Sequence, residues 1–301
     1  MPRRMARAFP TLPLHTLRHS LLLAVVMLTV FGLGARCYKP DTRVIVFIQG
    51  IYTTYDGETQ STAVEGPRFS TLKSAFADAG YEAGDLLDFS YAGGTVDGGG
   101  AWEPNDYSCE LTDRTAAENL AFLEQMLRDY RAKHEGAHFT LVGHSLGGYL
   151  AYLEGAREAD RPEAEKLDID VVVTLDAPLE GVDADKKAII DAIPCEKTYV
   201  AGAEIVAQKF DPGIQAMRGA EAERMAAQGV RLATVGNVND CLWNTSHCLP
   251  GSGFIDDSGT QFVEGATVFS YEFASAPLAS HDAILAHGPA VADVVGFVGD
   301  P

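Results

Sequence analysis

The sequence is short of basic residues. Its 301 residues include 23 lysines and arginines against 42 aspartates and glutamates, a formal net charge of −19. A surface this acidic repels the phosphates of nucleic acids, so we expect no nucleic-acid partner. Hydrophobic residues make up 47% of the chain and charged residues 22%. That balance is typical of a globular protein and excludes a disordered or collagen-like chain.

The sequence also lacks the signatures of metal and cofactor sites. Its histidines show no helical i, i+4 pairing with a glutamate, and its cysteines do not have the spacing of zinc ligands. It contains neither a phosphate-binding loop nor the glycine fingerprint of dinucleotide binding. We therefore expect a protein that needs no metal and no cofactor.

The first 40 residues differ from the rest because they contain six basic residues and no acidic one. Ser20–Ala35 carries no charge over sixteen residues, which is short of the roughly 20 that a membrane-spanning helix prefers. A basic start, an apolar run and then small residues is the order of a secretory signal. We expect residues 1–40 to be a signal peptide or a membrane-anchor segment. Lipidation of Cys37 is an alternative, against which Arg36 stands where a small residue is expected.

Export of the domain follows from this interpretation. The protein would be secreted or anchored to the outer face of the cytoplasmic membrane, and its N-terminal segment would contact the membrane at least during export. Five cysteines fit such a compartment. Cys241 and Cys248 are close in sequence and form the first candidate disulfide, and Cys109 and Cys195 could form a second. Connectivity cannot be deduced from spacing, and free, buried thiols are the alternative.

Apolar runs alternate with helical patterns after residue 40. The strand-like runs cover residues 43–49, 86–91, 139–142, 171–175, 230–235 and 267–271. Helical spacing appears at residues 69–79, 184–193 and 214–227, and in a long segment up to Tyr130 that Asp113 could cap. Alternation of this kind predicts an α/β fold with a mostly parallel sheet and helices on both faces. Ligands of such sheets bind beyond the carboxyl ends of the strands.

A G-x-S-x-G motif follows one of these runs directly. Gly143-His144-Ser145-Leu146-Gly147-Gly148 lies between the strand at 139–142 and a helical segment. A tight turn of this type raises the serine hydroxyl above the sheet, and its glycines avoid collisions with neighbouring backbone. We predict that Ser145 is a nucleophile and that the backbone N–H of Leu146 stabilises an oxyanion. A glycine-rich turn with a solvated serine is the alternative.

These motifs resemble those of α/β-hydrolases of the lipase and esterase kind, over about residues 43–298. The resemblance implies an α/β-hydrolase domain at residues 41–301 with a lid-like insertion at about 179–228. It also implies a second backbone oxyanion donor after the first strand, which falls on Ile51. In this chain Gln49 stands where the family has a histidine.

A nucleophilic serine requires a base and an orienting carboxylate, and in this fold the acid precedes the histidine in the chain. The stretch 236–243 resembles the acid-bearing turn of many lipases, so Asp240 is the expected acid. Asp176, at the end of the run 171–175, is the rival acid, with a structural cap as its other interpretation.

Three histidines follow Asp240. His281 stands after the last predicted strand and before an apolar closing helix, the position of the family's catalytic histidine, so it is the expected base. His287 and His247 remain alternatives, and His144 is expected to pack in the pocket wall.

The predicted function is that of an exported serine hydrolase that cleaves small-molecule or lipid esters through an acyl-enzyme. An acyltransferase or an amidase would use the same triad. A non-catalytic surface protein that retains the fold is the alternative from another class.

Overall fold

A computed structural model describes residues 42–56, 60–62, 69–182, 195–196, 198, 200–208, 212–238, 260–272 and 281–299. All of them belong to one compact unit, residues 41–301. Several sequence predictions lie outside the described residues and stay predictions: the N-terminal segment with Cys37, the acid Asp240, the alternative base His247, and the pair Cys241 and Cys248. Among the described helices, none has the length and apolar character that crossing a bilayer requires.

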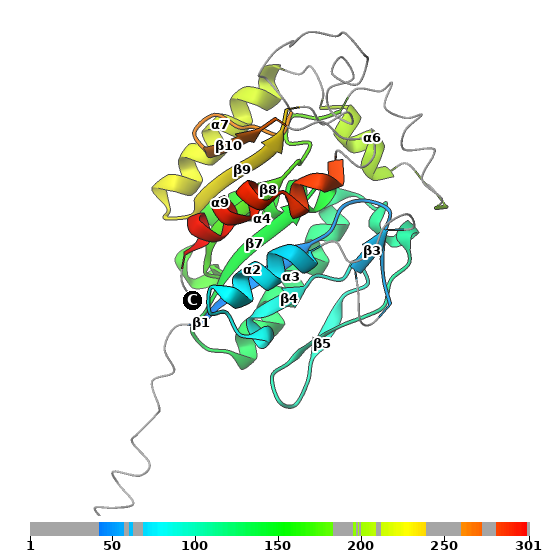
Figure 1. The fold of residues 1–301 in the computed structure, drawn as a ribbon, viewed down its shortest axis with the longest axis vertical. Helices are drawn as coiled ribbons and strands as arrows, with labels where there is room; N and C mark the ends of the chain where they lie inside the picture. The colour runs from blue at the N-terminus through cyan, green and yellow to red at the C-terminus, as the bar shows by residue number, and fades with distance from the viewer. Residues whose placement is uncertain are drawn as a thin grey trace, which may run out of the picture. The chain divides into compact units, whose positions relative to one another are not determined.

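A six-stranded parallel sheet forms the centre of the fold (Figure 1). Its strand order is β10-β9-β8-β7-β1-β4. The strands are β1 (Thr42–Ile48), β4 (Leu86–Asp88), β7 (Ala137–His144), β8 (Ile169–Leu175), β9 (Arg231–Asn237) and β10 (Thr267–Tyr271). Each of the six predicted apolar runs overlaps one of these strands, and all neighbours pair in parallel. The α/β prediction with a mostly parallel sheet is confirmed for this part of the chain.

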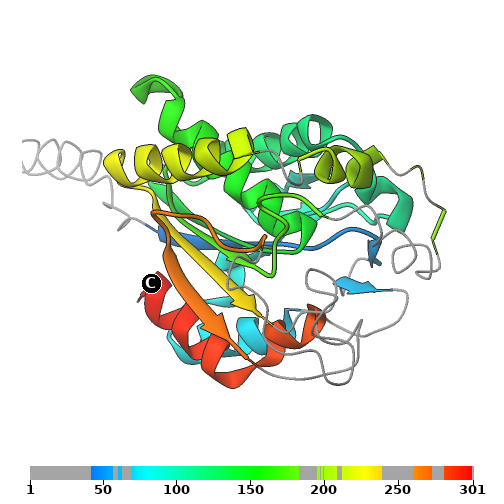
Figure 2. The same cartoon turned by 90° about the horizontal axis from the view of Figure 1, so that it is seen from above.

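Helices pack on both faces of the sheet. The central strand β1 shows this, because its alternate side chains are buried on opposite faces. Val44, Val46 and Ile48 pack in one apolar cluster, whereas Ile45 and Phe47 belong to another. The first cluster includes residues of α3 (Ala116–Lys133), α4 (Leu146–Asp160), α6 (Val200–Val206) and α7 (Pro212–Ala227). The second includes residues of α2 (Ser70–Asp78) and α9 (Gly288–Val298). Figure 2 shows α2 and α9 on one side of the sheet and α4 and α7 on the other.

Shorter elements complete the described structure. Two antiparallel pairs are β2 (Thr53–Tyr55) with β3 (Gln60–Thr62), and β5 (Gly94–Val96) with β6 (Trp102–Pro104). The 3₁₀ turns are η1 (Ala83–Asp85), η2 (Cys109–Thr112), η3 (Glu163–Glu165) and η6 (Ile284–Ala286).

The prediction that Asp113 caps the long helix is wrong. That helix, α3, begins at Ala116, and its N-cap is Thr115. The Thr115 side chain accepts the N–H of Glu118, while the Glu118 carboxylate accepts the N–H of Thr115. This reciprocal capping box satisfies two N–H groups at the helix start, which leaves Asp113 available for other contacts.

Cys109 and Cys195, a pairing that the sequence left open, form a disulfide. The disulfide joins η2 to a segment 86 residues later in the chain, just before α6.

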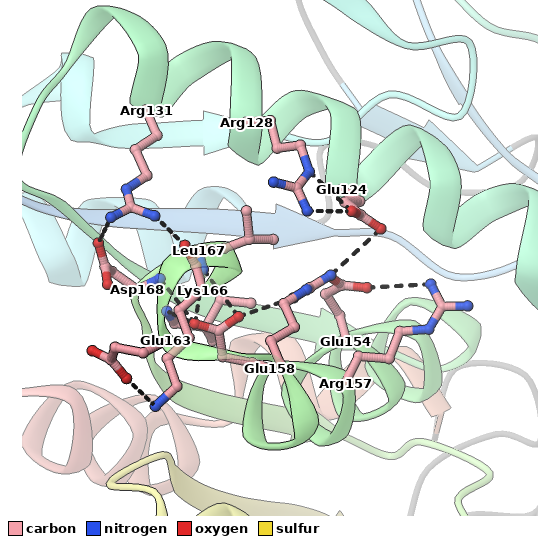
Figure 3. A network of polar contacts seen from close by, with 12 residues as sticks. Glu124, Arg128, Arg131, Glu154, Arg157, Glu158, Glu163, Lys166, Leu167 and Asp168 are labelled. Carbon is pink, nitrogen blue, oxygen red and sulfur yellow. Dashed lines mark hydrogen bonds and ion pairs between the residues drawn. The ribbon is translucent and has the colours of Figure 1, made fainter.

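A buried ionic network at the end of α4 fixes the entry to β8 (Figure 3). The Glu158 carboxylate is 2% exposed and accepts the N–H groups of Leu167 and Asp168 at 2.9 Å. Arg161 neutralises Glu158 at 2.9 Å and also pairs with the fully buried Glu154 at 2.6 Å. The network lies at the C-terminal end of α4 and the N-terminal end of β8, whereas Ser145 lies at the other end of both elements. It therefore fixes α4 and β8 at their ends away from the predicted nucleophile.

Candidate active site

Ser145 forms the turn between the carboxyl end of β7 and the start of α4. Its backbone has φ 56° and ψ −126°, a conformation in which a side chain is strained and glycine is favoured. The Ser145 N–H donates to the carbonyl oxygen of Leu175 at 2.9 Å, so the turn is fastened to the end of β8. The serine therefore sits at the carboxyl edge of the sheet, where the α/β topology places ligands.

The glycines around Ser145 are required by backbone contacts. A Cβ atom on Gly143 would lie 2.2 Å from the carbonyl oxygen of Gly147. A Cβ on Gly147 would lie 2.1 Å from the carbonyl oxygen of Ile48, at the end of β1. Such approaches cannot be relieved by a rotamer change because both partners are main chain. The turn at Ser145 therefore packs its backbone directly against the backbone at the end of β1.

The loop after β1 touches the nucleophile directly. A Cβ on Gly50 would lie 2.9 Å from Ser145 Cβ and 3.3 Å from Ser145 Oγ. The Ile51 N–H belongs to the peptide bond between Gly50 and Ile51, which therefore lies next to the Ser145 hydroxyl. Leu146 is the first residue of α4, where N–H groups have no acceptor within the helix. Ile51 thus adjoins the glycine that contacts Ser145, and Leu146 directly follows Ser145. Their role as backbone oxyanion donors stays a prediction.

Gln49, which replaces the histidine of the family pattern, is fully buried. Neither its Nε2 nor its Oε1 has a hydrogen-bond partner in the described part of the chain. Its main-chain carbonyl accepts the Tyr91 hydroxyl at 2.6 Å. Burial raises the pKa of Tyr91 well above its ordinary value, so the hydroxyl stays protonated and donates. The main chain of Gln49 is therefore anchored, while its side chain makes no polar contact with those residues.

His281 lies next to the nucleophile turn. Its ring centroid is 4.6 Å from that of His144, the residue that precedes Ser145. The His144 Nε2 donates to the carbonyl oxygen of His281 at 2.9 Å, and His144 is fully buried. His144 thus packs against the predicted base and holds its backbone. His287 lies elsewhere, since its ring packs on that of Tyr271 in β10, with centroids 5.1 Å apart.

Asp176 directly follows β8 and is fully buried. Its φ of 42° turns the chain sharply, and its N–H donates to the carbonyl oxygen of Val235. Its Oδ1 accepts the N–H of Asn237 at 2.8 Å. The carboxylate of Asp176 therefore fixes the end of β9, three residues before Asp240 in the chain.

Three residues near the nucleophile carry contacts that the sequence did not indicate. Tyr52, with φ 59°, donates its N–H to Thr112 Oγ1 at 2.7 Å. The Tyr52 hydroxyl donates to Asp113 Oδ2 at 3.2 Å. These partners are separated from Tyr52 by 60 and 61 residues, so no local pattern could reveal them.

One cluster of potential metal ligands occurs within the described ranges, formed by Cys109, Glu110 and Cys195. Its two sulfur atoms are joined in the disulfide, which leaves no thiolate for a metal.

A cavity of about 750 Å³ lies between α3, α4, α6 and α7. Leu120, Leu153 and Met217 are among the residues that line it, and none of the predicted catalytic residues is.

No protein-family model and no curated protein sequence matches the chain. The solved structures to which it is similar include lipases and esterases of the α/β-hydrolase fold. One is a lipase-esterase related protein from Clostridium acetobutylicum, with 13% identity and a TM-score of 0.43, over 86% of this chain and 95% of that chain. Another belongs to the metagenome-derived lipolytic enzymes LipS and LipT, with 13% identity and a TM-score of 0.46, over 86% of this chain and 94% of that one.

Phospholipase PlaB from Legionella pneumophila is also similar, with 12% identity and a TM-score of 0.44. The similarity covers 67% of this chain but 41% of PlaB, so the chain spans about two fifths of that enzyme's length. The roles of individual residues are therefore argued from the geometry around Ser145 alone.

Proposed function

We propose that this protein is a serine hydrolase that cleaves carboxylic esters, with Ser145 as its nucleophile. The observation that carries the proposal is the strained turn at Ser145, at the carboxyl edge of a parallel sheet and against the backbone of Gly50. Strain of this kind persists where the surrounding structure imposes it, and it is concentrated at functional sites. A serine that only filled a surface turn would not need flanking glycines so tightly packed that an added Cβ would lie 2.1 Å and 2.2 Å from backbone oxygens.

The remaining roles follow from the arrangement around Ser145. His281 acts as the base, supported by its position against His144. Asp240 orients His281, and its place in the chain, just after the anchored Asn237, supports this role. Asp176 acts as a structural cap of β9, because its Oδ1 is engaged by a backbone N–H.

In the first half-reaction, His281 removes the hydroxyl proton of Ser145 and the serine oxygen attacks the ester carbonyl carbon. The N–H groups of Ile51 and Leu146 stabilise the resulting oxyanion. The bond between the acyl carbon and the alcohol oxygen then breaks, and the alcohol leaves with the proton from His281. Water repeats the sequence on the acyl-enzyme and releases the acid.

We further propose that the domain works outside the cytoplasm on small-molecule or lipid esters. The order of basic, apolar and small residues in the first 40 positions supports export. The Cys109–Cys195 disulfide supports it as well, since disulfides persist in oxidising compartments.

Labelling with a fluorophosphonate probe, followed by peptide mass spectrometry, tests the nucleophile. We expect the adduct on Ser145, no labelling of a Ser145→Ala variant, and hydrolysis of p-nitrophenyl esters of graded acyl length by the unmodified protein. An unlabelled Ser145 in a folded, unmodified protein would refute the proposal.

Paired substitutions test the other two members. Asp240→Asn should lower kcat far more than Asp176→Asn, and His281→Ala far more than His287→Ala. Reversal of either order, with each variant shown to be folded by circular dichroism, would reassign the acid or the base.

A further inference from the structure

The oxyanion loop, defined here as residues 50–52, is strained at its far end. Tyr52 has φ 59°, which is uncommon for a residue other than glycine and which persists only where the surroundings impose it. At the near end, Gly50 has no side chain and offers little resistance to rotation. The direction of the Ile51 N–H between them therefore depends on how Tyr52 is held.

Tyr52 is held at two points by η2 and the residue that follows it. Its N–H donates to Thr112 Oγ1 at 2.7 Å, and the Thr112 hydroxyl in turn donates to the carbonyl oxygen of Cys109 at 2.7 Å. Its ring hydroxyl donates to Asp113 Oδ2 at 3.2 Å. Thr112 is fully buried, Asp113 is 3% exposed and Tyr52 is 1% exposed. Because water has no access to these groups, loss of either acceptor leaves a buried donor without its partner.

The same carboxylate joins a third segment to this anchor. Asp113 Oδ2 accepts the N–H of Thr198 at 2.9 Å, and Oδ1 accepts the N–H of Ala201, in α6, at 3.0 Å. The Thr198 hydroxyl returns a bond to the carbonyl oxygen of Asp113 at 2.9 Å. Asp113 therefore links the oxyanion loop to the start of α6, within the stretch expected to form a lid.

We propose that Thr112 and Asp113 are positioning residues for the second oxyanion donor. They keep Tyr52 in its left-handed conformation and thereby hold the Ile51 N–H beside Ser145, without touching the reacting atoms. This inference rests on the proposed function. Because Asp113 also accepts the N–H groups of Thr198 and Ala201, the position of the Ile51 N–H depends as well on the segment that leads into α6.

The kinetic consequence of this role is specific. A donor aimed at the oxyanion acts on charge that develops in the transition state, so its displacement lowers kcat and leaves KM nearly unchanged. Thr112→Val keeps the shape of the side chain but removes the acceptor for the Tyr52 N–H. Since a displacement of about 1 Å can cost up to about a hundredfold in rate, we expect a fall in kcat of about tenfold or more. Thr112→Ser retains the hydroxyl and should restore kcat to within about twofold of the unmodified protein.

The experiment measures kcat per active site, counted by fluorophosphonate titration, and KM on a p-nitrophenyl ester. It also measures the affinity for a trifluoromethyl ketone, whose adduct with serine carries an oxyanion. Thr234→Val is the matched control, because Thr234 is also fully buried and its hydroxyl has no hydrogen-bond partner in the described ranges. Tyr52→Phe, which removes the hydroxyl that donates to Asp113, serves as a milder second variant should Thr112→Val unfold.

We expect Thr112→Val to lower kcat and the affinity for the ketone by the same factor, with KM within about twofold of the unmodified value. Tyr52→Phe should shift both quantities in the same direction by less, and Thr112→Ser and Thr234→Val should behave like the unmodified protein. An unchanged kcat per active site in Thr112→Val and Tyr52→Phe, with losses only in melting temperature or active fraction, would overturn the positioning role. If the unmodified protein neither reacts with the probe nor hydrolyses esters, the proposed function itself fails. That result differs from failure of the positioning role alone, in which the unmodified protein is active.

Discussion

Replacement of Ser145 by glycine should stabilise the protein relative to replacement by alanine. Both variants lack the hydroxyl, so they differ only in how the backbone tolerates φ 56° and ψ −126°. A side chain in such a sparsely populated region costs about 1–3 kcal/mol. Glycine relieves this strain but loses about 0.5–1 kcal/mol through the greater freedom of the unfolded chain. The difference should be about 1 kcal/mol in favour of Ser145→Gly.

A difference of this size is measurable by thermal and urea unfolding. For a domain of this length, 1 kcal/mol raises the melting temperature by about 2–4 °C. Both variants are expected to be inactive, so bound substrate or product does not affect the comparison.

Ala220→Gly, at an exposed position in the interior of α7, is the control for the intrinsic effect of glycine. It should lower stability by about 1 kcal/mol, the opposite sign. If Ser145→Gly is no more stable than Ser145→Ala, the turn is not strained and the main argument for a nucleophile at this position is lost.

Four other substitutions have definite expected outcomes in the same unfolding assays. Gly147→Ala should prevent folding or lower the melting temperature sharply because its Cβ would lie 2.1 Å from a backbone oxygen. Gly296→Ala, in α9 with no atom within 4 Å of the added Cβ, is its control and should raise stability by up to about 1 kcal/mol. Gln49→Met should stabilise the protein by about 1 kcal/mol, since it removes a buried amide that has no partner among the described residues; a loss of stability would show that the amide is satisfied. Glu158→Gln should destabilise by about 2 kcal/mol because it removes the charge of one of the two buried α4 carboxylates that pair with Arg161 and weakens two backbone bonds; a change below about 1 kcal/mol would contradict the assigned role.

Much of the framework could be predicted from local sequence patterns. The runs of β-branched residues at 43–49 and 171–175 predicted strands buried on both faces, because such runs fit only the interior of a parallel sheet. The motif at 143–148 predicted a tight strand-to-helix turn because the glycines and the serine that such a turn requires all lie within six residues. The resemblance to α/β-hydrolases predicted His281 as the base from its position after the last strand, and in the structure its ring lies against that of His144.

Other assignments failed or stayed open because local patterns carry no information about distant partners. Asp113 looked like a helix cap, since an acidic residue before a helical stretch has that meaning in isolation. In the folded chain Thr115 takes that role, and the carboxylate of Asp113 serves Tyr52 and Ala201, 61 and 88 residues away. Likewise, chain order did not reveal that the Asp176 carboxylate accepts the Asn237 N–H at the end of β9, and its rival role as the triad acid stays a prediction.

The sequence by itself determined the strands, the order of the helices around them and the strained turn at Ser145, because each depends on side chains within a few residues of one another. Only the tertiary structure decided what surrounds that turn. The contact of Gly50 with Ser145, the anchoring of Tyr52 by η2 and the buried position of Gln49 all arise where β1, β7 and η2 converge. Packing of backbone on backbone at such a point depends on the three-dimensional path of the chain, which no local pattern contains.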